Sequence, residues 1–350
     1  MKVDIFNPDK KYQIIYADPA WGYKDKVLAG KRGGNEMTND FLKLAAQNLI
    51  IYDAFIKCDG ILKTHKNIAM SISGGKDSDI VLDIVHKLDK EKKCRYIFFD
   101  TGIEYRATKE HLKYLEQKYN IKIERFRPKK SVIKSCQEHG QPLLSKYVSE
   151  MISRLQKHGF KWEDQSFEEL ILKYPKCKVA IGWWTNYHKS DQFNIRRNKG
   201  LKEFILKKNG VDFKVSVKCC DYAKKNVSKN FVKQNSIDLM ITGIRKAEGG
   251  IRSSAYRTCY DEKGHYRPIF WFKNSDIEEY EKIFDIKHSD CYEVYGLKRT
   301  GCAGCPFVKN LKQELEVIEE FEKSLSFAVN RCFEKSYEFT KKYKAEYRSL

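Results

Sequence analysis

The feature that most constrains the fold of this chain is an apolar run that ends at two glycines and leads directly into an amphipathic stretch. Residues 68–72 are apolar or small, and residues 79–88 place apolar side chains at helical spacing. Between the two lie Ser73, Gly74, Gly75, Lys76, Asp77 and Ser78. The pattern predicts a strand, a glycine-bearing loop and a helix in immediate succession.

This loop has the chemistry of a phosphate site. Its two glycines let the backbone turn sharply with N–H groups toward a ligand, and the N-terminus of the next helix favours an anion. Lys76 adds a positive charge, Ser73 and Ser78 add hydroxyl donors, and Asp77 can cap the helix or orient a metal ion such as Mg²⁺. An ordinary βα turn is the alternative. The spacing is not GxxxxGK[ST], so a P-loop NTPase is not expected.

The rest of the chain predicts an α/β fold with a mostly parallel sheet and helices on both faces. Strands are expected at residues 67–71, 95–99, 121–126, 213–217 and 238–244, with helices at 79–88 and 107–119 between them. In such sheets ligands bind outside the carboxyl ends of the strands.

Three regions depart from this alternation. We expect a leader at residues 1–46, a helical insertion at about 131–210 within a domain at 47–310, and two charged amphipathic helices at 311–350. No apolar run is long enough to span a membrane, and no export signal is found near the start. Eleven cysteines without such a signal indicate a reducing compartment, so a cytoplasmic location is expected.

The loop resembles the SGGxDS signature of the PP-loop superfamily, which contains ATP pyrophosphatases and phosphoadenosine phosphosulfate (PAPS) reductases. The resemblance implies an adenine-nucleotide alpha-hydrolase-like fold that binds ATP or PAPS with Mg²⁺. Asp100, Thr101 and Gly102 look like the DTG segment of the family. Gly243, Arg245 and Arg252 are similar to a GxR...R stretch, which implies that both arginines meet phosphate or sulfate oxygens. Lys76, Asp77 and the two arginines are the expected catalytic residues; an exposed basic turn is the alternative for the arginines.

Four cysteines have the spacing of a metal site. Cys219 and Cys220 are adjacent, and Cys302 and Cys305 form a CxxC motif roughly eighty residues later. This resembles the [4Fe-4S] ligand pattern of adenosine phosphosulfate (APS) reductases and iron-sulfur PAPS reductases. Four thiolates can bind four irons of a cubane, whereas one zinc ion would require both adjacent cysteines to converge. Zinc and unligated thiols are the alternatives. Cys259 and Cys291 could be other ligands or persulfide carriers.

Three functions are compatible with these residues. In the first, the chain splits ATP at the α-phosphate, adenylates a substrate and lets sulfur displace AMP, as the resemblance to the iron-sulfur subunit of DNA phosphorothioation systems implies. In the second, a thiolate attacks PAPS or APS; reductases of this kind usually carry a C-terminal nucleophile motif, and Cys332 does not match it. In the third, the chain sequesters a nucleotide without turnover. The sulfur or electron donor is not identified by the sequence.

Two features bear on nucleic acid. The net charge of +20 attracts polyanions such as DNA or RNA, although it also fits a lysine-rich solvated surface. Trp183, Trp184 and Tyr187, followed by Arg196, Arg197 and Lys199, could form a stacking surface, but a local aromatic core is the more common arrangement.

The leader carries a separate resemblance. The run DPAW at residues 18–21 looks like the DPPW motif of N6-adenine methyltransferases, with Ala20 in place of the second proline. The leader is too short to form a methyltransferase fold, so we interpret it as an inactive recombined fragment.

Overall fold

The computed structural model describes residues 48–249 and 255–347. The DPAW run and Arg252 lie outside these ranges. The strands are β1 (Ile68–Ser71), β2 (Cys94–Phe99), β3 (Ile123–Phe126), β4 (Leu239–Ile241), β5 (Tyr260–Asp261) and β6 (His265–Tyr266). The helices around the sheet are α2 (Leu49–Thr64), α3 (Lys76–Leu88), α4 (Arg106–Tyr119), α11 (Asn226–Gln234), α13 (Asn274–Phe284) and α14 (Asp290–Glu293).

These strands form a six-stranded sheet in the order β3-β2-β1-β4-β6-β5. All neighbouring pairs are parallel except β5 and β6, and β1 aligns Ile68 with Cys94 on one side and with Leu239 on the other. The predicted α/β class with a mostly parallel sheet is therefore confirmed. Four of the five expected strands are present, at β1 to β4.

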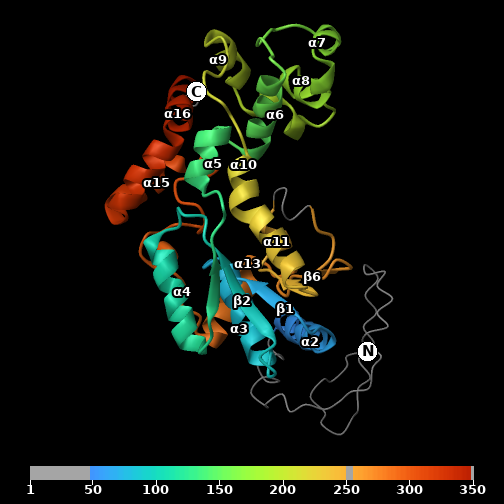
Figure 1. Ribbon diagram of the computed structural model, residues 1–350, viewed down its shortest axis with the longest axis vertical. Coiled ribbons are helices and arrows are strands. Elements are labelled where there is room, and N and C mark those ends of the chain that lie inside the picture. The colour runs from blue at the N-terminus through green and yellow to red at the C-terminus, as the bar shows by residue number, and fades with distance from the viewer. Residues whose placement is uncertain (1–47, 250–254, 348–350) are drawn as a thin grey trace, which may run out of the picture. The chain divides into compact units, whose positions relative to one another are not determined.

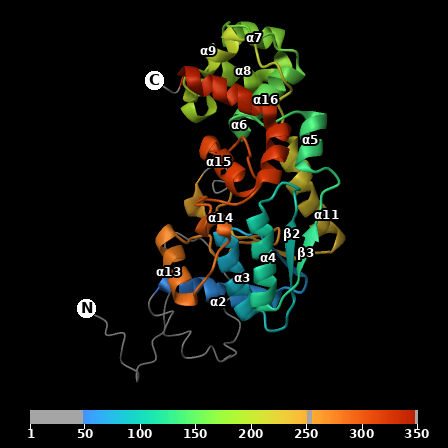
Figure 2. The same ribbon diagram turned by 90° about the vertical axis from the view of Figure 1, so that its left-hand side faces the viewer.

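The chain order explains why helices cover both faces of the sheet (Figures 1 and 2). Right-handed crossovers through α3 and α4 run in the same direction along the sheet, so both helices lie on one face. The return to β4 runs the other way and places α11 on the opposite face. There Phe231 of α11 packs against Ala69, Ile97 and Met240.

A second core lies in the helices between β3 and β4, drawn mostly in green in Figure 1. Trp183, Trp184 and Phe204 are fully buried in it, and α16 contributes Phe339 and Tyr343. Burial of both tryptophans supports the aromatic-core interpretation over a stacking surface. The helices are α5 (Val132–His139), α6 (Lys146–Lys157), α7 (Phe167–Lys173), α8 (Lys178–Trp184), α9 (Leu201–Lys207) and α10 (Lys218–Cys220), followed downstream by α15 (Leu311–Phe321) and α16 (Lys323–Tyr347).

The expected strand at residues 213–217 is wrong. Only Val215 forms a bridge there, with Gln141, and the segment joins no sheet. Phe213 and Val215 are buried in the helical core. The alternation of apolar side chains therefore indicates an extended segment with one buried face. Such a segment can be buried without pairing with a neighbouring strand. Within the described ranges, no helix is long and apolar enough to cross a membrane.

Candidate functional site

The loop between β1 and α3 is held open by one serine hydroxyl. Ser78 Oγ accepts hydrogen bonds from the backbone N–H groups of Ser73 and Gly75, at 3.3 and 3.2 Å, and donates to the Gly75 carbonyl at 2.8 Å. Gly74 has φ +68°, a backbone conformation that favours glycine. Helix α3 begins at Lys76, so its free N–H groups and positive dipole end face the loop. This geometry is that of an anion site.

The segment after β4 closes on the start of α3. A side chain on Gly243 would place its Cβ 2.9 Å from the Asp77 carbonyl, so only glycine permits this approach. Two residues later, Arg245 Nε lies 2.9 Å from Asp77 Oδ1. Burial raises the pKa of Asp77 to about 6, although Arg245 opposes the shift. The structure thus brings Gly243 and Arg245 to the loop, and pairs Arg245 with a loop carboxylate.

Lys76 has no close ionic partner at the described residues. Its Nζ lies 3.8 Å from Glu281 Oε1 and 5.5 Å from the centre of the Tyr292 ring, and 40% of its side chain is exposed. A weakly held ammonium group at the mouth of the loop is free to turn toward a phosphate.

A buried charge network stands behind this lysine. Asp79 Oδ2 lies 2.9 Å from His111 Nε2 and 2.8 Å from His288 Nδ1, and His288 Nε2 lies 2.9 Å from Glu281. Burial alone would lower the pKa of His288, but the two carboxylates raise it. The network links the core of α3 to Glu281 and, through it, to Lys76.

The residues after β2 form a second turn at the same edge of the sheet. Gly102 N–H donates to Asp100 Oδ1 at 3.0 Å, and Thr101 donates through both its N–H and its hydroxyl to Glu104 Oε1. The Thr101 hydroxyl also lies 3.4 Å from the Cys302 sulfur. The predicted DTG segment therefore contacts the CxxC loop.

The two cysteine pairs, distant in sequence, converge. Cys219 and Cys220 end α10, and Cys302 pairs with Glu104 as an antiparallel bridge. Cys219 is buried in a cluster against which Cys220 and Cys302 also pack. Negative charge on Cys302 would raise the pKa of both Cys220 and Cys305. Burial raises the pKa of Cys305 to about 12, with the Cys302 charge adding to the shift.

These four thiols fit an iron-sulfur cluster by their chemistry. They are soft ligands gathered in a largely buried place, and their mutual repulsion when ionised would be offset by bound iron. Among the described residues, no three His, Cys, Asp or Glu side chains are arranged around a single metal-ion position.

Further thiols adjoin this quartet. The neighbouring Cys136 thiol and then the Cys220 thiol lower the pKa of Cys219. Cys136 in turn contacts Cys332 of α16, and both are buried. Cys291 is also fully buried and lies 3.5 Å from the Thr108 hydroxyl, while Cys259 precedes β5. Cys136 and Cys332 were not expected here because no sequence spacing relates them to the quartet.

One contact joins the phosphate loop to the cysteines. A Cβ on Gly75 would lie 3.1 Å from both the Thr300 hydroxyl and the Tyr292 hydroxyl. The Thr300 N–H donates to the Tyr292 hydroxyl at 3.2 Å, and Thr300 is two residues from Cys302. Neither Tyr292 nor Thr300 was predicted, because an isolated tyrosine or threonine carries no motif. The loop, DTG turn and CxxC loop thus form one connected surface.

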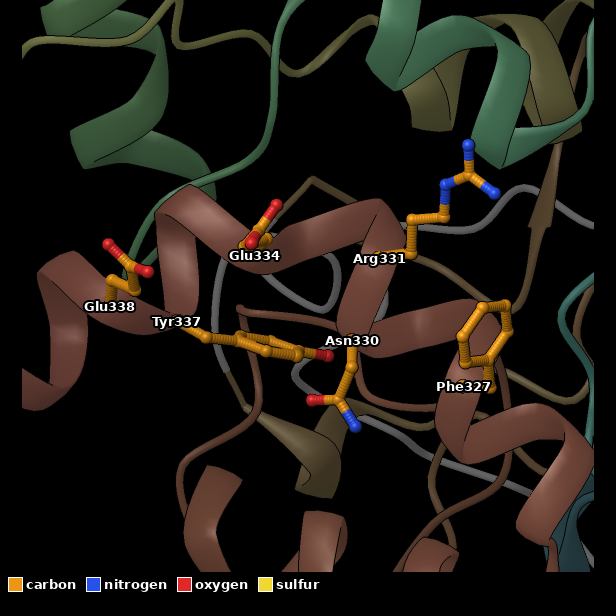
Figure 3. A pocket seen from close by; sticks show the side chains of 6 residues that line it. All are labelled: Phe327, Asn330, Arg331, Glu334, Tyr337 and Glu338. Atoms are coloured by element: carbon orange, nitrogen blue, oxygen red, sulfur yellow. The ribbon is translucent and has the colours of Figure 1, made fainter.

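A pocket along α16 lies apart from the predicted residues (Figure 3). Of the side chains drawn there, Tyr337 reaches the CxxC loop, since its hydroxyl donates to the Gly304 carbonyl. The other residues that line the pocket are Phe327, Asn330, Arg331, Glu334 and Glu338. None of the predicted ligands lines this pocket.

Residues 67–163 match the family model of the phosphoadenosine phosphosulfate reductase domain. The match includes the loop and the DTG segment. An uncharacterized protein of Methanocaldococcus jannaschii, MJ0066, is 27% identical over 143 residues, which are 41% of this chain and 28% of that protein. The aligned part is thus under a third of the relative's length.

The chain is also similar to parts of several solved structures. PAPS reductase from Candida auris has a TM-score of 0.41 and 13% identity, over 77% of this chain and 98% of that one. NH3-dependent NAD synthetase from Campylobacter jejuni has a TM-score of 0.33 and 15% identity, over 83% of this chain and 96% of that one. The U34-tRNA thiolase NcsA from Methanococcus maripaludis with its [4Fe-4S] cluster has a TM-score of 0.32 and 12% identity, over 83% of this chain and 79% of that one.

The Asp77 carboxyl should titrate near pH 6. Its ion pair with Arg245 then forms as the pH rises through 6. Because the pKa of Asp77 is higher in the folded chain than in the unfolded chain, the free energy of unfolding falls as the pH rises from about 4 to about 6. Arg245→Leu should raise the pKa further, since the guanidinium lowers it. ¹³C NMR of labelled aspartate, assigned by Asp77→Asn, measures both values; a midpoint near 4 would contradict the buried geometry.

Proposed function

We propose that this chain binds ATP at the loop of residues 73–78 and adenylates a substrate for sulfur transfer, with a [4Fe-4S] cluster on Cys219, Cys220, Cys302 and Cys305. The observation that carries the proposal is the contact of Gly75 with Tyr292 and Thr300, which sets an anion-binding loop beside four thiols. A phosphate site and a soft-metal site joined through Tyr292 and Thr300 would suit a reaction that joins nucleotide activation to sulfur chemistry.

The loop residues would act on the phosphates. Backbone N–H groups of Gly74 and Lys76 and the N-terminal end of α3 would hold the pyrophosphate of ATP, and the Lys76 ammonium would turn from Glu281 to neutralise it. Asp77 would orient Mg²⁺, and Arg245, released from Asp77, would meet an α-phosphate oxygen. Asp100, Thr101, Gly102 and Gly243 would shape the wall, and Arg252 is proposed as a second oxyanion ligand on sequence alone.

The reaction then proceeds in two displacements. A substrate oxygen attacks the α-phosphorus, the bond to pyrophosphate breaks, and AMP is joined to the substrate. Sulfide then attacks the activated carbon or phosphorus, and AMP leaves with the oxygen, so no electrons are exchanged. A bound cluster would supply redox-active iron and a binding place for sulfide.

Reduction of PAPS or APS is the second candidate, and the family match at residues 67–163 favours it. That reaction needs a thiolate that can reach the sulfate group. Cys332, the thiol nearest the C-terminus, is buried against Cys136. The adenylation reading requires no such nucleophile, so we prefer it.

Nucleotide turnover separates these readings. With ATP and sulfide under anaerobic conditions, the chain should release pyrophosphate once its acceptor is supplied, and Lys76→Ala should weaken ATP binding about 10- to 100-fold because a charged phosphate contact is lost. Lys90→Ala, an exposed lysine at the far end of α3, is the control. Sulfite and adenosine bisphosphate from PAPS would instead establish the reductase, and tight ATP binding without product would leave a sequestering protein.

Cluster content tests the ligand set directly. Anaerobically purified chain should carry about four irons and four sulfides, and the double variant Cys220→Ser, Cys302→Ser should lose most of both. Cys177→Ser, a buried cysteine of the helical core, should retain them. Full iron and sulfide in the double variant, by colorimetric assay and electron paramagnetic resonance, would show that other residues hold the metal.

A further inference from the structure

A group of lysines surrounds a pocket beside the cysteine pair. The pocket lies where α10, a π-helical turn (Asp221–Lys225) and α11 follow one another, and it is lined by Lys218, Asp221, Tyr222, Lys225, Asn226 and Lys229. Lys130 stands 5.0 Å above the Tyr222 ring, and His139 stacks on that ring with centroids 5.0 Å apart. We call Lys130, Lys146, Lys214, Lys218, Lys225 and Lys229 the lysine patch.

The patch holds like charges together with few carboxylates. Asp221 pairs with Lys225 at 2.7 Å and Glu138 pairs with Lys130. Burial and the nearby Lys225 ammonium lower the pKa of Lys146. Burial lowers the pKa of His139, and the positive charges of Lys130 and Lys218 lower it further. Six ammonium groups around two carboxylates repel one another, and a bound polyanion would relieve that repulsion.

The patch borders the proposed reaction site along one turn of chain. Lys218 immediately precedes Cys219, and Lys224 follows Cys220 by four residues within the π-helical turn. Lys225, the next residue, is 52% exposed in the patch. A π-helical turn adds one residue to the helical repeat and is frequently found at functional sites. Here it follows directly on the two ligand cysteines and carries lysines toward both the thiols and the pocket.

We infer that the lysine patch binds the phosphate backbone of a polynucleotide strand and thereby presents it to the site formed by the phosphate loop and the cysteines. The inference rests on the proposed function for what happens to the strand, but binding itself does not depend on it. A groove of lysines that follows the backbone, with an amide such as Asn226 within it, is the common means of holding nucleic acid without reading sequence.

Two other polyanions fit less well. A membrane surface would need apolar side chains to insert, and the large exposed apolar residues among the described ones, such as Phe327, Leu172 and Val294, are not part of the pocket lining. An acidic protein would supply carboxylates at irregular spacing, whereas a polynucleotide carries one phosphate charge at every residue of its backbone. The sulfur acceptor must also bring a displaceable oxygen to the nucleotide. Nucleobase carbonyls and phosphates provide such oxygens.

The test compares two triple variants of equal charge in the full, anaerobically purified chain. Lys218→Ala, Lys225→Ala and Lys229→Ala alter the patch. Lys66→Ala, Lys90→Ala and Lys122→Ala remove three exposed lysines near the amino ends of the strands. Fluorescence anisotropy measures binding of a labelled 20-nucleotide oligo(dT) and oligo(U), with poly-glutamate of the same charge as competitor, from 50 to 300 mM salt. ATP binding by each variant is measured in parallel.

We expect the patch variant to bind either strand at least 10-fold more weakly, with a salt slope shallower by about 2, since each lost phosphate contact lowers it by about 0.7. The control variant should change less than 2-fold, and replacing the three patch lysines by arginine should retain binding. The inference is overturned if neither strand binds, if both variants lose affinity equally, or if poly-glutamate competes as well as the oligonucleotides. If the wild-type chain does not bind ATP, the proposed function is rejected instead.

Discussion

The site depends on the bend that Ser78 enforces at the tip of β1. Its hydroxyl satisfies the first amide groups of the loop and one carbonyl, so the chain can reverse at Gly74 without leaving buried polar groups unpaired. Because α3 then starts at once, its N-terminal amides have no helical partners and can face an anion. Gly243 and Gly75 allow β4 and the CxxC side to approach this bend closely.

The parallel strands place the predicted site residues at one edge of the sheet, where the strands have their carboxyl ends. The segments after β1, β2 and β4 meet there because the strands run in the same direction, and the CxxC loop joins them through Thr101 and Thr300. The adjacent cysteine pair arrives from α10, which packs near α5 rather than on the sheet. The loop of residues 73–78 and the thiols thus come from two separate parts of the chain, and Tyr292 and Thr300 are the residues that connect them.

Local patterns predicted much of this arrangement and missed its long-range contacts. Periodicity located α3, α4 and β1 to β4, since each has one apolar face, but the same alternation at Phe213 and Val215 produced a false strand because burial does not require a ladder. Motifs predicted the loop and both cysteine pairs. Tyr292, Thr300 and Cys136 are brought to the site by tertiary contact alone, and no local signal marks them. The binding and catalytic roles given to all the predicted site residues, Arg252 included, stay predictions, and so do the domain boundaries.

The most direct test of the account is whether ATP binding slows hydrogen exchange in the CxxC loop as well as in the loop of residues 73–78. Hydrogen–deuterium exchange under anaerobic conditions, with and without ATP and Mg²⁺, should show slower exchange in peptides that cover Ser73–Ser78 and, in the same experiment, in those that cover Thr300–Cys305. Protection of neither segment, or protection confined to the helices between β3 and β4, would contradict a nucleotide site built on the loop and joined to the thiols.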